Sequence, residues 1–162
     1  KHEISLEATV VYDLCHERIV DLGRWDYVSH QVIASPFKPI DYMDKIDVLA
    51  ARYLTDTKIT CKYLTVELKK DEAEKSTIDQ ILKYVDWVCT EYAYGDYEMI
   101  EACIIAAGYE EGMDRYYREV VQRHYTQGSH PVRNKQWNNL KLLKYTCVDG
   151  EIVYEDVTPP LR

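Results

Sequence analysis

Leu64-Thr65-Val66-Glu67-Leu68-Lys69 sets two charged residues inside a run of strand-forming apolar residues, and Ile46-Asp47-Val48-Leu49-Ala50 does the same with one acid. Successive side chains of a strand point to opposite faces, so Glu67 and Lys69 share one face. A charge on a largely buried face needs a partner or a metal ion. The two stretches therefore predict two strands that carry a chemical site.

If these two strands pair, Asp47 can face the same spot as Glu67 and Lys69. Two carboxylates beside one ammonium group suit a divalent ion, Mg²⁺ or Mn²⁺, and a phosphate, because such ions prefer oxygen ligands and activate water. The ammonium group would stabilise the charge that develops on the phosphate. The alternative is a structural salt bridge of Lys69 with Asp47 or Glu67. Three charges among Val, Leu and Ala favour a site for hydrolysing phosphodiester bonds.

The chain has 162 residues, which suits a single domain, residues 1–162, that folds without disulfides. No run of 18 apolar residues and no signal peptide is visible, so we expect a cytoplasmic protein without a membrane partner. The five cysteines are widely spaced, and we expect reduced core thiols. Because the first residue is Lys1 rather than Met, we expect that the chain can be part of a larger one.

The net charge is −8, but the window from Arg115 to Lys144 holds seven Lys or Arg against one acid. Tyrosines and Trp137 interleave with these basic residues and could stack on unpaired bases. A solvated basic face is the alternative interpretation. As a nucleic-acid surface, the window would bind through Arg118, Arg123, Arg133 and Lys135.

Hydrophobic periodicity predicts the order of the elements. We expect a helix over 5–21, capped by Ser5 and ended by Gly23, strands over 27–34, 45–54 and 59–69, a charged linker over 70–76, helices over 77–92, 97–107 and 112–125, and a polar loop over 126–135. The three strands suggest an antiparallel meander. A hairpin at the end turns at Asp149-Gly150.

Two helices carry polar residues at informative positions. Glu7 lies on the apolar stripe of the first helix, so its carboxylate should lean toward the core, although a first-turn acid favoured by the helix dipole is equally consistent. Glu3 is a second candidate for an acid there. Gln80 and Tyr84 stand four residues apart, on one edge of the helix over 77–92.

The order of these features resembles the PD-(D/E)XK nuclease superfamily over roughly residues 5–88. Val66-Glu67-Leu68-Lys69-Lys70, followed by Ile78-Asp79-Gln80-Ile81-Leu82-Lys83-Tyr84-Val85, resembles the ExK and Q-x-x-x-Y pattern of RecB-like nucleases and of the mismatch-cleaving endonucleases of archaea and actinobacteria. Ile46 stands where the name of the superfamily puts Pro. Nothing past about residue 95 resembles a family element.

The resemblance implies an α/β fold with a restriction-endonuclease-like core, about residues 5–95: a mixed sheet of about four or five strands, with the first helix on one side and the Gln80 helix on the other. Peripheral helices and the C-terminal hairpin would fill about 96–156.

It also implies roles. Asp47, Glu67 and the backbone carbonyl of Leu68 would bind Mg²⁺ or Mn²⁺, and Glu7 would complete the shell directly or through water. Lys69 would orient the attacking water, while Gln80 and Tyr84 would hold the water, the phosphate or the lysine.

The expected function is a metal-dependent nuclease, an endonuclease rather than an exonuclease, acting on DNA. A homodimer is consistent with this function, since two sites cut both strands of a duplex most simply. One alternative is a catalytically silent module that binds nucleic acid or a partner protein. Another is an RNA-cutting enzyme controlled by a ligand on a separate domain. His16, His30 and the pair His124 and His130 lack the spacing of a metal site and are interpreted as structural or surface residues.

Overall fold

The computed structural model describes residues 2–34 and 44–161, and the side chains from Ser5 onward. In chain order the elements are α1 (His2–Cys15), β1 (Tyr27–Ile33), β2 (Lys45–Tyr53), β3 (Thr60–Ala73), α2 (Lys75–Glu91), the 3₁₀-helix η2 (Tyr97–Met99), β4 (Ile100–Tyr109), α3 (Met113–Val120), β5 (Arg123–Gln127), β6 (Arg133–Trp137), β7 (Leu140–Val148) and β8 (Glu151–Asp156). No helix within these described ranges is both long and apolar enough to cross a membrane.

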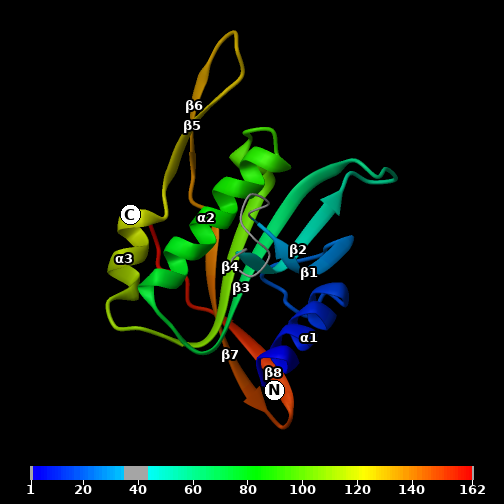
Figure 1. Ribbon diagram of the computed structural model, residues 1–162, viewed down its shortest axis with the longest axis vertical. Coiled ribbons are helices and arrows are strands. Elements are labelled where there is room, and N and C mark those ends of the chain that lie inside the picture. The colour runs from blue at the N-terminus through cyan, green and yellow to red at the C-terminus, as the bar shows by residue number, and fades with distance from the viewer. Residues whose placement is uncertain (1, 35–43, 162) are drawn as a thin grey trace.

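In the described part of the chain, six strands form one mixed sheet in the order β1-β2-β3-β4-β7-β8 (Figure 1). The first three are an antiparallel meander, as the sequence predicts. β4 is parallel to both β3 and β7, and β8 returns antiparallel to β7. β5 and β6 form a separate two-stranded ribbon. The α/β class is confirmed, with one or two strands more than expected.

The two faces of the sheet are covered by different helices. α1 packs Leu6, Val10 and Leu14 against one face, where the sheet contributes Val48, Val66 and Ile105 among others. α2 packs its stripe of Ile78, Ile81, Val85 and Val88 against the other face, with Leu49, Ala102 and Ile104. This arrangement confirms the expectation that the first helix and the Gln80 helix lie on opposite sides.

The predicted helix over 97–107 is wrong, since Ile100–Tyr109 is strand β4. This strand lies between two parallel neighbours and is buried on both faces, so its sequence is a continuous apolar run rather than an alternating one. Periodicity alone cannot separate such a strand from a buried helix. The region after residue 95 thus supplies three strands of the sheet.

Other boundaries also differ from the expectation. α1 starts at His2, so Ser5 lies inside it and accepts a hydrogen bond from Thr9 at its carbonyl oxygen rather than capping the helix. The helix stops at Cys15, well before Gly23, because the chain turns at Glu17, which has a φ of 58°.

Further along the chain, β3 continues through Ala73, so most of the expected linker over 70–76 is strand. The helix expected over 112–125 ends at Val120. Strand β5 begins where the end of that helix was expected, and β5 and β6 together occupy both ends of the expected polar loop over 126–135. The C-terminal hairpin is confirmed: Asp149 and Gly150 both have positive φ, 52° and 86°, as its tight turn requires.

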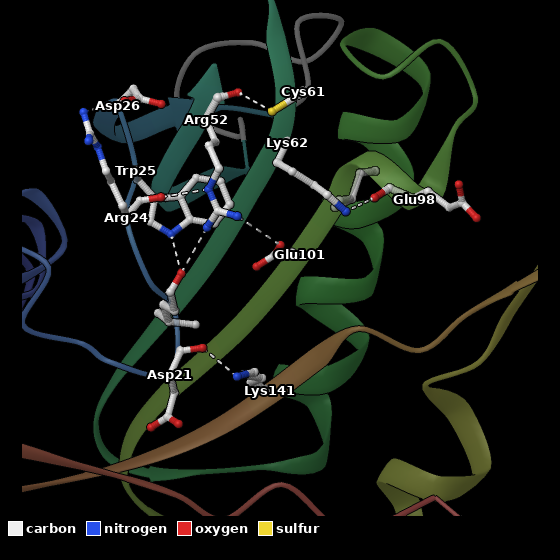
Figure 2. Close-up of polar contacts among 12 residues, drawn as sticks. Asp21, Arg24, Trp25, Asp26, Arg52, Cys61, Lys62, Glu98, Glu101 and Lys141 are labelled. Carbon is white, nitrogen blue, oxygen red and sulfur yellow. Dashed lines mark hydrogen bonds and ion pairs between the residues drawn. The ribbon is translucent and has the colours of Figure 1, made fainter. Parts of the chain in front are cut away.

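Arg52 of β2 binds the segment between α1 and β1 through a hydrogen bond and a cation–π contact (Figure 2). Its guanidinium lies over the Trp25 ring at 4.4 Å from the centroid, and its Nε donates to the Arg24 carbonyl oxygen at 2.8 Å. Lys141 of β7 donates to the Asp21 carbonyl oxygen at 2.6 Å. Arg52 and Lys141 therefore both bind backbone carbonyls of the segment between α1 and β1, which is a structural role.

All five cysteines are free, but only two are core residues. Cys89 and Cys103 are buried, Cys61 is half-buried, and Cys15 and Cys147 are exposed. The expectation of free thiols is confirmed, while that of core positions is wrong for Cys15, the last residue of α1, and for Cys147, which lies in β7 close to the turn of the C-terminal hairpin.

The strand assignment of β4 predicts the effect of one substitution. Ile104 is fully buried between the two helical layers, so Ile104→Ala should lower the free energy of unfolding by about 2–5 kcal/mol. Ile59, which is 62% exposed, provides the matched control, and Ile59→Ala should change it by less than about 0.5 kcal/mol. Urea denaturation measures both, and similar losses would contradict the packing described here.

Candidate functional site

Asp47 and Glu67 lie next to each other on neighbouring strands. The paired part of the β2–β3 ladder ends at Val48 with Val66, so Asp47 and Glu67 are the next residues on the two strands. Opposed residues of an antiparallel pair point to the same face. The Leu68 N–H donates to Asp47 Oδ2 at 2.8 Å. The Asp47 carboxylate thus accepts the hydrogen bond that a backbone carbonyl of β2 would otherwise accept, and it is held against β3.

Glu67 and Lys69 form a close ion pair on β3. Lys69 Nζ donates to Glu67 Oε1 at 2.8 Å, and the Glu67 side chain is only 3% exposed, against 33% for Lys69. The predicted sharing of one face is confirmed. This contact is also the salt bridge of the alternative interpretation, so the pair by itself fits both a structural and a chemical role.

Glu7 reaches the same site from α1. Its Oε1 is 2.7 Å from His30 Nδ1, and its Oε2 accepts from Gln31 Nε2 at 2.9 Å. Gln31 Nε2 is also 3.4 Å from Asp47 Oδ1. Through one amide group, therefore, the acid of the first helix is joined to the acid of β2. Glu7 is mostly buried, as its place on the apolar stripe predicts, whereas the side chain of Glu3 lies outside the described part.

Gln31 has an unusual backbone. Its φ is 52°, in the left-handed region that residues other than glycine seldom adopt and that costs about 1–3 kcal/mol. Its neighbours His30 and Val32 pair with Val48 and Ile46 of β2, so Gln31 lies beside Asp47. A strained conformation directly beside the candidate site is a typical mark of a functional position.

His30 and Gln31 are the site residues that sequence reasoning missed. His30 is exposed, as expected for a surface residue, yet it also contacts Glu7. No sequence signal separates these two residues from other polar residues of an edge strand, because their contacts reach across 23 and 24 residues of chain.

Gln80 and Tyr84 form the expected pair on α2. Gln80 Nε2 donates to the Tyr84 hydroxyl at 3.0 Å. Burial raises the pKa of Tyr84 to about 12, the Gln80 hydrogen bond opposes this, and the negative charges of Glu67, Asp44 and Asp47 add to it. Two of these carboxylates, Glu67 and Asp47, belong to β3 and β2, and Asp44 directly precedes β2. Tyr84 is therefore a neutral hydrogen-bond donor at ordinary pH.

The donor set fits a hard divalent cation in kind. Glu7, Asp47 and Glu67 offer carboxylate oxygens and Leu68 a backbone carbonyl, which are the ligand types that Mg²⁺ and Mn²⁺ take. Within residues 2–34 and 44–161, no three His, Cys, Asp or Glu side chains already stand together as a complete metal-binding group. N–H donors hold the carboxylates instead, among them Leu68, Lys69 and Gln31.

The four basic residues expected to bind nucleic acid are not all equally available. Arg123 pairs with Asp86 at 3.1 Å, and Lys135 pairs with Glu98. Arg118 donates to the Pro160 carbonyl oxygen at 3.2 Å. Arg133 is exposed at the start of β6. The positive charge of this window is thus partly balanced by acids from other parts of the chain.

No protein-family model matches the chain, and no curated protein matches it. Two solved structures are similar to it. A repair endonuclease from Pyrococcus abyssi is 20% identical over 70% of this chain and 43% of its own, with a TM-score of 0.47. EndoMS in a complex with dsDNA is 20% identical over 70% of this chain and 40% of its own, with a TM-score of 0.43.

The chain spans less than half the length of either structure. A likeness at 20% identity concerns the fold alone, so the chemistry of this chain depends on its own residues.

The unequal burial of the Glu67–Lys69 pair predicts unequal effects on stability. Lys69→Met leaves a nearly buried carboxylate without this cation, and we expect the free energy of unfolding to fall by about 2 kcal/mol, between the values for exposed and buried pairs. Glu67→Gln leaves an ammonium group that water can reach, so its loss should be less than half as large. Urea denaturation in EDTA measures both, and a larger loss for Glu67→Gln would contradict this.

Proposed function

We propose that the chain is a divalent-metal-dependent nuclease that hydrolyses phosphodiester bonds of DNA, as an endonuclease. The observation that supports this best is the convergence of three separately positioned groups: Asp47 at the end of the β2–β3 ladder, the Glu67–Lys69 pair on β3, and Glu7 joined to Asp47 through Gln31. A salt bridge alone would need neither Asp47 nor Glu7.

In this proposal each residue has a separate task. Asp47, Glu67 and the Leu68 carbonyl would hold Mg²⁺ or Mn²⁺, with Glu7 as a further ligand directly or through water. When bound there, the ion would supply a lowered pKa for a water molecule and positive charge for the phosphate oxygens.

Lys69 supplies the positive charge for the attacked phosphate, and its contact with Glu67 keeps the ammonium group in position. The Tyr84 hydroxyl donates a hydrogen bond to the water or the phosphate, its raised pKa keeps it protonated into alkaline solution, and Gln80 orients it. His30 and Gln31 act on Glu7 and Asp47, so they are positioning residues.

One observation favours a second candidate, a nuclease-like module that binds nucleic acid or a partner protein without cutting. Lys69 already compensates the charge of Glu67 at 2.8 Å, which a non-catalytic protein could retain for its fold. The two candidates differ in whether Lys69 is needed for chemistry.

Cleavage assays test this difference. The wild type should cut at least one of single-stranded DNA, duplex DNA, nicked circles or RNA in Mg²⁺ or Mn²⁺ and none in EDTA. Lys69→Met should lower the single-turnover rate at least about 100-fold, because it removes a charge that stabilises the transition state. Lys58→Met, which removes an exposed lysine from the turn before β3, is the matched control and should cut like the wild type.

Metal-dependent cutting that survives in Lys69→Met would reject the proposed role of Lys69. A wild type that binds these substrates but cuts none in either metal would favour the non-cutting module. Cutting of RNA alone would move the substrate class from DNA to RNA.

Gln31→Ala tests the link between the two acids. Loss of the amide frees Glu7 and Asp47 from each other, and we expect the concentration of Mg²⁺ that gives half-maximal cleavage to rise about 10–100-fold, with the rate largely recovered at saturating Mg²⁺. Gln122→Ala, at an exposed position between α3 and β5, is the matched control and should leave the metal dependence unchanged. An unshifted metal dependence in Gln31→Ala would reject the positioning role.

A further inference from the structure

The ribbon of β5 and β6 stands apart from the main sheet. Its strands pair antiparallel from Arg123–Trp137 at the root to Gln127–Arg133 near the tip, and Figure 1 shows it projecting beyond the end of α2. Residues 128–132 close the tip and are all exposed. Apart from Trp137 and Tyr125, which pack into the core, the ribbon lies outside it, so a function of the ribbon would depend on its exposed surfaces.

One face of the ribbon fixes it to the body. Trp137 is buried, and its Nε1 donates to the Ile100 carbonyl oxygen at 2.8 Å. Gln127 Nε2 donates to Asp96 Oδ2 at 3.0 Å, and Arg123 and Lys135 pair with Asp86 and Glu98 on the same side. The Tyr125 ring also contacts that of Tyr97. The ribbon is therefore held in one orientation before any partner binds.

The opposite face carries four side chains, which we name the outer ribbon face: His124, Thr126, Asn134 and Gln136. They lie opposite each other in two cross-strand pairs, His124 with Gln136 and Thr126 with Asn134, and all four are exposed. Each is uncharged or weakly basic and can form hydrogen bonds. The face contains no aliphatic residue, so a hydrophobic partner does not fit it.

Negative charge is missing from this part of the sequence. No Asp or Glu occurs between Glu119 and Asp149, whereas a stretch of 29 residues at the average of this chain, 28 acids in 162 residues, would hold about five. A merely solvated hairpin would be expected to carry some of them. The absence of acids together with exposed Arg133 and His130 makes the ribbon compatible with a polyanion.

We propose that the outer ribbon face docks in the major groove of duplex DNA; this deepens the proposed function by naming the form of its substrate. The major groove of B-DNA, about 12 Å wide, admits a two-stranded ribbon. Asn134 and Gln136 can pair with base edges, and Thr126 can contact bases or phosphates. Arg133, which pairs with Gln127 on the other face of the ribbon, adds an exposed positive charge near the tip. The deep, narrow major groove of duplex RNA does not admit such a ribbon.

Fluorescence anisotropy of a labelled DNA duplex in EDTA tests docking without cleavage. The variant carries His124→Ala, Thr126→Ala, Asn134→Ala and Gln136→Ala together, and we expect its affinity to fall at least about 10-fold. The control, Thr146→Ala with Val153→Ala, removes an exposed cross-strand pair from the β7–β8 hairpin and should bind like the wild type. Duplex RNA and single-stranded DNA serve as further probes, and neither should lose affinity in the fourfold variant.

A second variant covers the case in which four alanines disturb the ribbon. Asn134→Asp with Gln136→Glu keeps the size of both side chains and adds two charges that repel phosphates, so its affinity for the DNA duplex should fall further, with a thermal melting temperature close to that of the wild type. Unchanged duplex binding in this variant would overturn the proposal. An equal loss for single-stranded DNA or duplex RNA would overturn docking in the DNA major groove.

The cleavage result separates this inference from the proposed function. A wild type that cuts, combined with ribbon variants that bind duplex DNA normally, would reject the ribbon and retain the nuclease. A wild type that cuts nothing, combined with ribbon variants that lose duplex binding, would reject the nuclease and retain the docking of the ribbon. A wild type that binds no DNA duplex would reject the ribbon proposal whatever it cuts.

Discussion

The burial of the Glu67 carboxylate in the middle of the sheet is the constraint on which the rest of the structure depends. An ionised group in this position is costly unless charged or polar groups surround it. Lys69 supplies one of these groups from the same strand, and Asp47 is anchored to the next backbone amide of β3. The strand that forms the centre of the fold is thus also the strand that carries the chemistry.

The topology brings the remaining groups to this place. β3 and β4 are parallel neighbours, so the chain has to cross one face of the sheet between them, and α2 makes that crossing. The crossing sets Tyr84 close enough to Glu67 and Asp47 for their charges to raise its pKa. α1, on the other face, contributes Glu7 through the edge strand β1. α1 is therefore linked to Asp47 by hydrogen bonds through Gln31, and Tyr84 of α2 interacts electrostatically with the carboxylates of Asp47 and Glu67.

The sequence predicts the part of the site that follows local rules. Strand alternation puts Glu67 and Lys69 on one face, a four-residue helical spacing pairs Gln80 with Tyr84, and the Asp-Gly turn gives the last hairpin. What it fails to predict depends on the surroundings in space. β4 looks like a helix because burial on both faces removes its alternation, and the positive φ of Gln31 has no marker in the residue type. The charged residues therefore stand out in the sequence more clearly than the side chains that orient them.

The bend at Gln31 has a second consequence, for the behaviour of the protein in concentrated solution. β1 is at the edge of the six-stranded sheet, and an edge strand offers its free amide and carbonyl groups to any strand that meets it. A residue with a left-handed backbone interrupts that regular row, and its side chain is occupied by Glu7 and Asp47. The same residue that joins the two acids therefore also makes this edge a poor template for a neighbouring molecule, which protects the sheet against edge-to-edge aggregation.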